Sequence, residues 1–270
     1  MKIKYVFLCL LSAISFAACD TISENERFEK IDLNVKKNVL IEDFTGQMCV
    51  NCPNMAAVID TLQSDSLIGD RVIAVAIHGG SLSLSSKIGS IGLATEVGEY
   101  YQKQNGVNAW PNAKVDRNGS LVDEKKLAAK VLERINEPPY LAMDMENSFS
   151  ESDSTVTVAV KLRGMNEEVA GKLQLWVIES GLVKLQYMPD GSTNYKYVHN
   201  HVFRDTIPGN GIDGENFELS GVEEKTVVHT FKLNKLWKAE NVSVVAFTYN
   251  NSGVLQAVAK GILPKEEQAY

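Results

Sequence analysis

The chain has 270 residues, of which 44% are hydrophobic and 23% are charged, and its formal net charge is −7. These values are typical of a globular protein and leave room for one large domain or two ordinary ones. The acidic balance and the lack of a long basic run exclude a nucleic acid as the main partner, because phosphate binding needs clustered Lys and Arg.

The first residues have the pattern of an export signal. Two lysines precede an apolar stretch over 5–16, which is too short to span a bilayer stably as a helix. The small residues Ala17-Ala18 then precede Cys19. We therefore expect residues 1–18 to be a cleaved signal peptide, with simple secretion as the alternative and a retained membrane helix disfavoured.

The sequence around Cys19 resembles the lipobox of bacterial lipoproteins, in which the cysteine becomes the lipidated first residue, although Phe16 replaces the usual Leu. A lipid on Cys19 would anchor the protein to a membrane, and the polar stretch 19–34 would act as a tether. Apart from Cys19, only Cys49 and Cys52 would remain in the mature chain.

A cysteine pair stands at the expected start of a helix. Residues 39–41 have the composition of a strand, 45–47 form a polar turn, and Cys49 and Cys52 follow directly. Apolar residues then recur at the spacing of one helix face, at Met55, Ile59 and Leu62.

In an exported protein this pair favours redox chemistry. A disulfide across a two-residue spacer stabilises a fold little, because loop-closure stabilisation grows with loop length, and a four-cysteine zinc site would need a second pair. The N–H groups and dipole of a helix N-terminus favour a thiolate at Cys49. We expect Cys49 to attack a partner's sulfur and a more buried Cys52 to resolve the mixed disulfide. The alternative is an inert pair on a binding domain.

The following elements alternate between strand and helix. A continuous apolar run over 71–78 predicts a strand buried on both faces, and with the preceding helix it predicts a right-handed strand–helix–strand unit. The later predicted elements are a loop over 79–90, a helix over 91–104, a strand entered near 107–115, a hairpin turn at 116–119, and a helix over 123–136 with Asp123 as its N-cap. Pro138-Pro139 marks the expected domain boundary.

From Tyr140 onward the hydrophobic period changes to two. About eight short runs separated by turn residues predict an antiparallel β-sandwich over 139–264, followed by a tail over 265–270. Residues 187–192 are interpreted as a loop without assigned chemistry. The clearest runs are 155–161, 172–179, 195–204, 217–220, 225–233, 242–249 and a last one from 254.

The order of elements over 35–137 resembles the thioredoxin fold. Asp43-Phe44 precede Cys49 where thioredoxin-like proteins have an acidic and an aromatic residue, and Pro111 stands where that fold has a cis-proline facing the disulfide. Three features differ from thioredoxin: Met48 rather than Trp precedes Cys49, the residues between the cysteines are Val50-Asn51 and not Gly-Pro, and the residue before Pro111 is the bulky Trp110.

This resemblance implies roles for three more residues. Asp43 would lie under the cysteine pair with a pKa raised by burial and accept the proton of Cys52, with Glu42 as the alternative if the register shifts by one residue. A cis Pro111 would present the backbone of Trp110 to a substrate chain, and the alternative is an ordinary trans turn proline. Trp110 would contact a peptide or cap the core.

His199 and His201 lie two residues apart on a predicted strand, so both would face the same side. Asp205 is only a weak third ligand, and we therefore prefer packing or interdomain hydrogen bonding for the two histidines and expect no metal. His78, at the end of a buried strand, is expected to be structural.

The whole chain is similar to a narrower family. The lipobox, the stretch EDFTGQMCVNCPNM and the later YVHNHVFR resemble the Omp28-related outer-membrane lipoproteins of Bacteroidetes. The resemblance implies an α/β thioredoxin-like domain over 35–138 followed by an all-β immunoglobulin-like sandwich, in an outer membrane lipoprotein that faces the periplasm or the cell surface. Surface adhesion has been proposed in that family.

Two functions are consistent with these patterns. The first is an exported, lipid-anchored thiol–disulfide oxidoreductase that acts on protein or peptide thiols and disulfides without a cofactor. Cys49, Cys52 and Asp43 would then be catalytic, and Trp110 and Pro111 would bind the substrate. The second is a surface binding or adhesion lipoprotein whose thioredoxin-like domain is a non-catalytic scaffold.

Overall fold

A computed structural model describes residues 35–87 and 91–263. The fold below is that of one compact unit, which begins at residue 36. The predicted signal peptide, the lipidation site Cys19, the tether 19–34 and the tail 265–270 lie outside the described residues.

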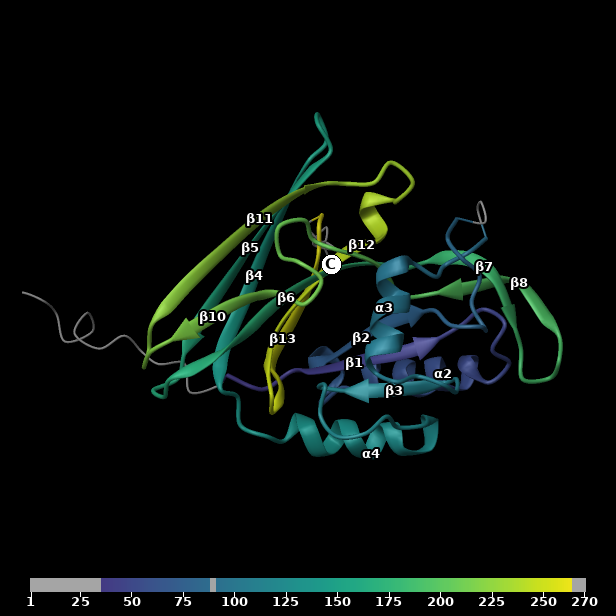
Figure 1. The fold of residues 1–270 in the computed structure, drawn as a ribbon, viewed down its shortest axis with the longest axis horizontal. Helices are drawn as coiled ribbons and strands as arrows, with labels where there is room; N and C mark the ends of the chain where they lie inside the picture. The colour runs from purple at the N-terminus through teal and green to yellow at the C-terminus, as the bar shows by residue number, and fades with distance from the viewer. Residues whose placement is uncertain (1–34, 88–90, 264–270) are drawn as a thin grey trace, which may run out of the picture. The chain divides into compact units, whose positions relative to one another are not determined.

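The first half consists of a strand–helix–strand unit followed by a helix, a strand and a helix (Figure 1). Strand β1 pairs with β2 in parallel, as expected for a strand–helix–strand unit, and with β3 antiparallel. We call residues 39–135 the α/β part. Its elements are β1 (Val39–Thr45), α2 (Cys52–Gln63), the 3₁₀ turn η1 (Gly69–Arg71), β2 (Val72–His78), α3 (Glu96–Gln104), β3 (Asn112–Val115) and α4 (Glu124–Ile135).

N-cap side chains set the first residues of helices α3 and α4. The side chain of Asp123 accepts hydrogen bonds from two first-turn amides of α4, which confirms it as the N-cap. Helix α3 begins at Glu96, later than the predicted 91, because Thr95 is its N-cap and accepts from the amide of Gly98 at 3.0 Å. The preceding residues of the predicted helix instead bond to the loop that begins at 79: both Leu93 and Ala94 donate to the carbonyl of Leu84.

The second half is built almost entirely of strands. The run 195–204, predicted as one strand, is split in two, because His201 has a left-handed φ of 55° that interrupts an extended chain. Its first part pairs with a strand that the sequence did not indicate, β7. The elements are β4 (Leu141–Ser150), β5 (Thr155–Gly164), β6 (Val169–Glu179), β7 (Leu182–Tyr187), β8 (Thr193–His199), β9 (Val202–Thr206), β10 (Glu215–Leu219), β11 (Glu224–Lys232), the 3₁₀ turn η2 (Ala239–Asn241), β12 (Val242–Asn250) and β13 (Gly253–Gly261).

One eight-stranded sheet runs through both halves. Its order is β13-β12-β6-β9-β2-β1-β3, and β10 also pairs with β6. The junction is the parallel contact of β2 with β9, which pairs Ala76 with Val202. The sheet therefore contains strands from both sides of the predicted boundary at 138–139. A three-stranded sheet, β11-β5-β4, and the separate hairpin β7–β8 complete a mostly β protein with several sheets.

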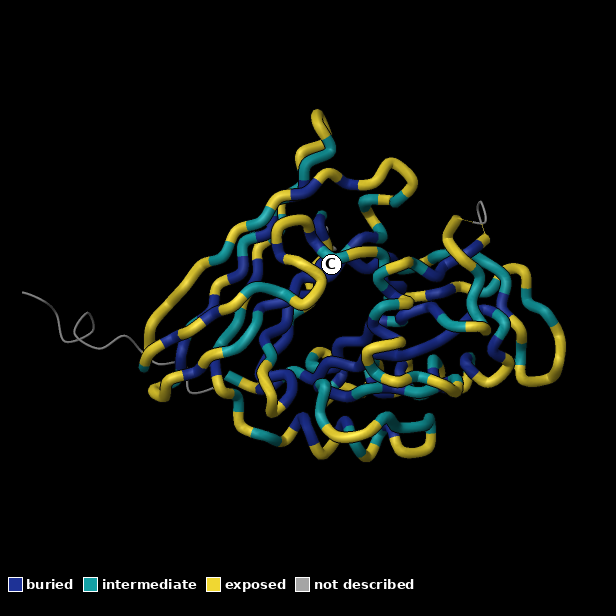
Figure 2. The backbone as a smooth tube through the Cα atoms, in the orientation of Figure 1, coloured by how far each residue is buried: buried dark blue, intermediate teal, exposed yellow. Residues whose placement is uncertain are grey.

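The large sheet is covered on both faces. In β1, Val39 and Ile41 face α2 and α4, whereas Leu40 and Phe44 face the opposite core, which also contains Tyr101 of α3. Strands β6 and β12 likewise send alternate residues to that second core and to a third core against the three-stranded sheet. Buried residues (dark blue in Figure 2) therefore follow the strands of the large sheet.

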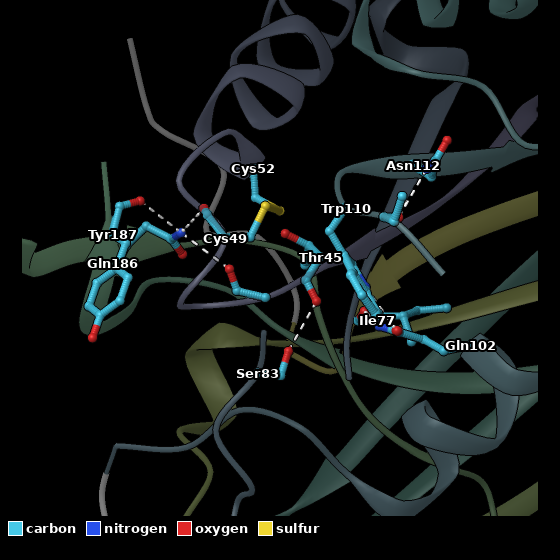
Figure 3. The surroundings of a disulfide bond; sticks show 12 residues. Thr45, Cys49, Cys52, Ile77, Ser83, Gln102, Trp110, Asn112, Gln186 and Tyr187 are labelled. Atoms are coloured by element: carbon cyan, nitrogen blue, oxygen red, sulfur yellow. Dashed lines mark hydrogen bonds between the residues drawn. A yellow bond between two sulfur atoms is a disulfide. The ribbon is translucent and has the colours of Figure 1, made fainter. Parts of the chain in front are cut away.

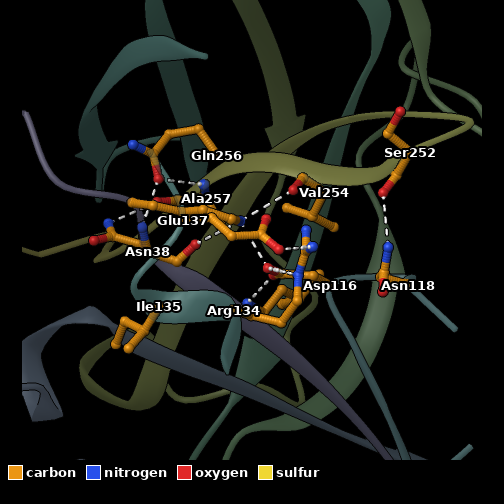
Figure 4. A network of polar contacts seen from close by, with 12 residues as sticks. Asn38, Asp116, Asn118, Arg134, Ile135, Glu137, Ser252, Val254, Gln256 and Ala257 are labelled. Carbon is orange, nitrogen blue, oxygen red and sulfur yellow. Dashed lines mark hydrogen bonds and ion pairs between the residues drawn. The ribbon is translucent and has the colours of Figure 1, made fainter. Parts of the chain in front are cut away.

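A buried charge network joins the α/β part to β13 (Figure 4). One carboxylate oxygen of Asp116, at the turn after β3, lies 2.7 Å from Nζ of Lys37 and 3.1 Å from Nε of Arg134, and the other accepts from the amide of Leu40 at 2.8 Å. The carbonyl of Asp116 accepts from the amide of Val254. Every oxygen of Asp116 thus has a partner, as a buried charge requires.

Candidate redox site

The cysteine pair lies between the end of β1 and the start of α2. Cys49 and Cys52 form a disulfide with an S–S distance of 2.12 Å and a Cα–Cα distance of 5.4 Å. Helix α2 begins at Cys52, and Pro53 occupies its first turn, where the missing N–H costs nothing. The predicted order of strand, turn, cysteine pair and helix is confirmed.

Both cysteines are enclosed. Cys49 is 1% exposed and Cys52 is 3% exposed, so the expectation that Cys49 is the more accessible sulfur is wrong. The reason is a long-range cover that no local pattern revealed: the side chain of Gln186 in β7 donates to the carbonyls of Cys49 at 2.9 Å and Gly46 at 3.2 Å. The amide of Met48 also donates to the loop that begins at 79.

Asp43 lies on the side of β1 that faces α2. It is 4% exposed, and its Oδ1 has no hydrogen-bond partner among the described residues. Burial raises the pKa of Asp43 from 3.8 to about 7, as predicted from its position. Glu42 points to the opposite face, where its carboxylate lies 3.2 Å from Arg117. Strand alternation therefore places Asp43, and not Glu42, on the side of the cysteines.

A cavity of about 60 Å³ brings Asp43 and Cys52 together with three histidines, His78, His199 and His201. His78 ends β2 and His199 ends β8, and their rings meet edge to face at 5.3 Å. Nδ1 of His78 has no hydrogen-bond partner among the described residues, whereas Nε2 of His199 lies 3.3 Å from the carbonyl of Leu185. The site thus combines a disulfide, a carboxylate and three imidazoles around one small cavity.

Burial favours the neutral form of His78 and of His199. It lowers the pKa of His78 well below 6.5, and the nearby His199 and Arg204 lower it further. Burial likewise lowers the pKa of His199 to about 4. The sequence analysis gave these histidines no part in the redox site. The parallel register that pairs Thr45 with His78 was the one available signal, because it places the ends of β1 and β2 side by side.

The Trp110–Pro111 peptide bond is cis, as predicted. Pro111 is buried, and Nε1 of the half-buried Trp110 donates to Oε1 of Gln102 at 3.0 Å. The indole also packs on Gly80, where an added Cβ would come within 2.1 Å of the ring. In the view of Figure 3, Trp110 lies on one side of the disulfide and Gln186 on the other.

The predicted histidine pair does not share a strand, since His199 ends β8 and His201 lies in the turn before β9. Both nevertheless line the cavity beside Cys52. Over the described ranges 35–87 and 91–263, no group of three or more His, Cys, Asp or Glu side chains is arranged to hold a metal ion. Within the same ranges, no helix is both long and apolar enough to cross a membrane.

A profile of the family described as outer membrane protein Omp28 matches residues 98–266, more than half of the chain. The chain belongs to the Omp28 family. It is therefore an outer membrane protein. The matched residues include Trp110 and Pro111 but begin after the cysteine pair. No curated protein sequence matches the chain significantly.

Solved structures show the same fold at low sequence identity. HBP35 of Porphyromonas gingivalis is 16% identical with a TM-score of 0.65, over 84% of this chain and 76% of that one. An Agrobacterium tumefaciens protein is 14% identical with a TM-score of 0.52, over 87% and 99% of the two chains. A domain of the outer membrane lipoprotein Omp28 from Porphyromonas gingivalis is 22% identical over 48% and 93%, and its TM-score of 0.34 is too low to add to the argument.

Proposed function

We propose that this Omp28 family member is a thiol–disulfide oxidoreductase of the outer membrane, and that its α/β part is a thioredoxin-like domain. The β part, in the same proposal, is an immunoglobulin-like sandwich that carries the cover of the site. The partners are protein or peptide thiols and disulfides. A lipid on Cys19 would hold the protein to the membrane, facing the periplasm or the cell surface.

One observation carries the proposal: a disulfide at a helix N-terminus shares a cavity with a buried carboxylate, Asp43, whose Oδ1 has no partner among the described residues. A disulfide over this short spacer contributes little to stability. A buried polar group without a partner costs stability outright. Neither feature helps the fold, whereas a carboxyl with a pKa of about 7 is suited to proton transfer near neutral pH.

The reductive direction runs in two balanced steps. The thiolate of Cys49 attacks one sulfur of a partner disulfide, and the partner's other sulfur leaves as a thiolate. The thiol of Cys52 then gives its proton to Asp43 and attacks Cys49, which releases the partner's second thiolate. The partner is reduced, Cys49–Cys52 becomes the disulfide, and a dithiol reductant restores the starting state. Oxidation of a partner is the same sequence reversed.

The substrate chain would be oriented by the cis peptide. The edge of β3 follows Pro111 directly, so an extended peptide placed beside it would gain main-chain hydrogen bonds with little sequence preference. The exposed edge of the indole of Trp110 would add apolar contact.

Single-residue variants test the proposal. The full chain should catalyse the reduction of insulin by dithiothreitol, and Cys49→Ser should fall to the uncatalysed rate. Cys52→Ser should instead accumulate a mixed disulfide through Cys49, because the resolving thiol is gone. His229→Gln, far from the site on β11, is the matched control and should keep the parent rate. A Cys49→Ser variant as active as the parent rejects the proposal.

The burial of both sulfurs favours a second candidate, a surface recognition protein with an inert disulfide. In that case beads coated with the protein should adhere to a cell or matrix surface, and the double variant Cys49→Ser/Cys52→Ser should adhere equally well. A loss of adhesion confined to the double variant, or no adhesion at all, would remove this candidate.

A further inference from the structure

Hairpin β7–β8 covers the redox site without belonging to the large sheet. Its two strands pair only with each other, as a separate two-stranded sheet inserted between β6 and β9. At its base, Gly181 and His201 both have left-handed φ values, 72° and 55°. The hairpin is thus joined to the sheet at two neighbouring points where the chain bends sharply, the geometry of a hinge.

The side chains of Gln186 and Gln47 and one backbone amide bind the hairpin to the cysteine turn, and Nε2 of Gln47 donates to the carbonyl of Leu185 at 3.4 Å. Nε2 of Gln186 donates to the carbonyls of Gly46 and Cys49, and the side chain is only 2% exposed. Next to it, the amide of Tyr187 donates to the carbonyl of Gln47 at 2.8 Å. The carbonyls of Gly46, Gln47 and Cys49 all belong to the turn that carries Cys49.

One side of the hairpin faces solvent, whereas His199 on the other side is buried against His78. Val183 and Val198 form a directly opposed pair and are 55% and 51% exposed, and Tyr195 near the far end is 75% exposed. Because these apolar side chains are exposed and β7 and β8 pair with no other described strand, lifting the hairpin costs less free energy than separating the core strands. Its closed position, by contrast, leaves Cys49 1% exposed, which excludes an incoming thiol.

We propose that hairpin β7–β8 is the access gate of the cysteine pair and that Gln186 is its latch. The biological use of the gate rests on the proposed oxidoreductase function. The gate itself does not depend on that function, because it states only that no thiol attacks Cys49–Cys52 until the hairpin lifts. The gate selects partners by size, because a small dithiol enters through a partial opening and a folded protein thiol needs the whole hairpin displaced. Gln186 is a positioning residue, since it touches the turn and not the reacting sulfurs.

The rate of reduction by dithiothreitol tests the latch in the full chain. Thiols are quenched by alkylation at intervals, and the peptide that contains Cys49 and Cys52 is followed by mass spectrometry. Gln186→Ala should be reduced on the order of tenfold faster than the parent, which corresponds to about 1.4 kcal/mol of lost latch interactions. Gln63→Ala is the matched control, because Gln63 also donates to a buried-strand carbonyl, at the far end of α2. Its rate should equal that of the parent.

Two results would overturn the gate. One is an unchanged rate in Gln186→Ala. The other is a parent disulfide that is reduced as fast as the disulfide in a free peptide of residues 48–53. A parent that exchanges with no protein disulfide, while Gln186→Ala still speeds reduction by dithiothreitol, would keep the gate and reject the oxidoreductase function.

Hydrogen exchange gives a readout that needs no variant. The amide of Tyr187 should exchange with solvent much faster than the amides of β1 under native conditions, because lifting the hairpin breaks its bond to Gln47 without unfolding the sheet. Exchange of this amide only through global unfolding would mean that the hairpin is a fixed part of the core, and would contradict the gate.

Discussion

The protein buries two aspartates in very different surroundings. Asp116 is fully buried among Lys37, Arg134 and the amide of Leu40, so each carboxylate oxygen has a partner. Asp43 is almost as buried, but its Oδ1 has none among the described residues. Asp43 lies in β1, and Asp116 directly follows β3, which pairs with β1. Both side chains are buried, so the difference between them does not come from their exposure to solvent.

The contrast separates a structural carboxylate from a functional one. At Asp116 the charge is compensated, and the network links the α/β part to β13. At Asp43 burial raises the pKa to about 7 without any compensating group, which destabilises the ionised form in the folded state. Groups left in this condition concentrate at functional sites, where their reactivity offsets the loss of stability.

The largest effect is expected at the compensated site. Asp116→Asn leaves Lys37 buried without its counter-ion and leaves Arg134 with Glu137 alone, and burial already lowers the pKa of Lys37 despite the carboxylate beside it. Breaking such a buried pair should lower the free energy of unfolding by about 3–5 kcal/mol. Urea denaturation at pH 7 measures it, and a loss below about 1 kcal/mol would mean that the network does not hold the halves together.

Asp43→Asn should raise the free energy of unfolding, whereas Asp116→Asn lowers it. The pKa of Asp43 is about 7 in the folded state and about 3.8 in the unfolded state, so between these values the folded state binds more protons. The free energy of unfolding of the parent therefore falls as the pH rises from about 4 to 7 and then levels off. Asn cannot ionise, so the variant should be more stable at pH 8, by up to about 4 kcal/mol. Equal stability at pH 8 would show that the carboxyl is compensated after all.

Asp43→Asn should also slow thiol–disulfide exchange. Without a carboxylate to accept the proton of Cys52, release of a preformed mixed disulfide should slow by on the order of 100-fold in single-turnover measurements. In the parent this rate should rise as the pH passes about 7, where Asp43 ionises. Glu42→Gln is the matched control on the opposite face of β1 and should keep the parent's pH profile. A slowed Glu42→Gln beside an unaffected Asp43→Asn would reverse the assignment.

His78→Asn should alter the acid side of the stability curve. The pKa of His78 is depressed in the folded state, so below about 6.5 the unfolded state binds the extra proton and stability is lost as the pH falls. The variant should lack this loss. The contribution opposes that of Asp43, so His78→Asn should steepen the fall in stability between pH 5 and 7. An unchanged curve would contradict a neutral, buried His78.

The smallest effect is expected at an exposed ion pair. Asp144 lies 2.7 Å from Lys260, but the two side chains are 66% and 45% exposed. Asp144→Asn should change the free energy of unfolding by less than about 1 kcal/mol, because solvent screens the pair. A loss as large as that of Asp116→Asn would remove the distinction between buried and exposed carboxylates on which the comparison depends.

Local chemistry made much of this site predictable. The spacing of Met55, Ile59 and Leu62 indicated the helix behind the cysteines, and strand alternation left only Asp43 and Glu42 as candidates for the buried acid. Asp123 was recognisable as an N-cap because its contacts are made within one helical turn. The cis bond before Pro111 was predicted from the resemblance to the thioredoxin fold, and no local propensity would have suggested it.

The cover of the site was not predictable, because it depends on contacts between distant segments. Gln186 and Cys49 are 137 positions apart, and a glutamine in a short strand carries no signal that it will bond to that turn. The ring contact between His78 and His199 also joins distant segments, and it was not predictable for the same reason. The shared sheet was also missed, since the parallel contact of β2 with β9 follows from assembly and not from the pattern of either strand.

The equilibrium reduction potential of the Cys49–Cys52 couple tests the central claim most directly. Measured in the full chain against a glutathione or dithiothreitol buffer, a redox-active pair should lie between roughly −120 and −270 mV, the range of known thiol–disulfide oxidoreductases. A potential below about −300 mV would identify a structural disulfide and leave the protein as a recognition scaffold.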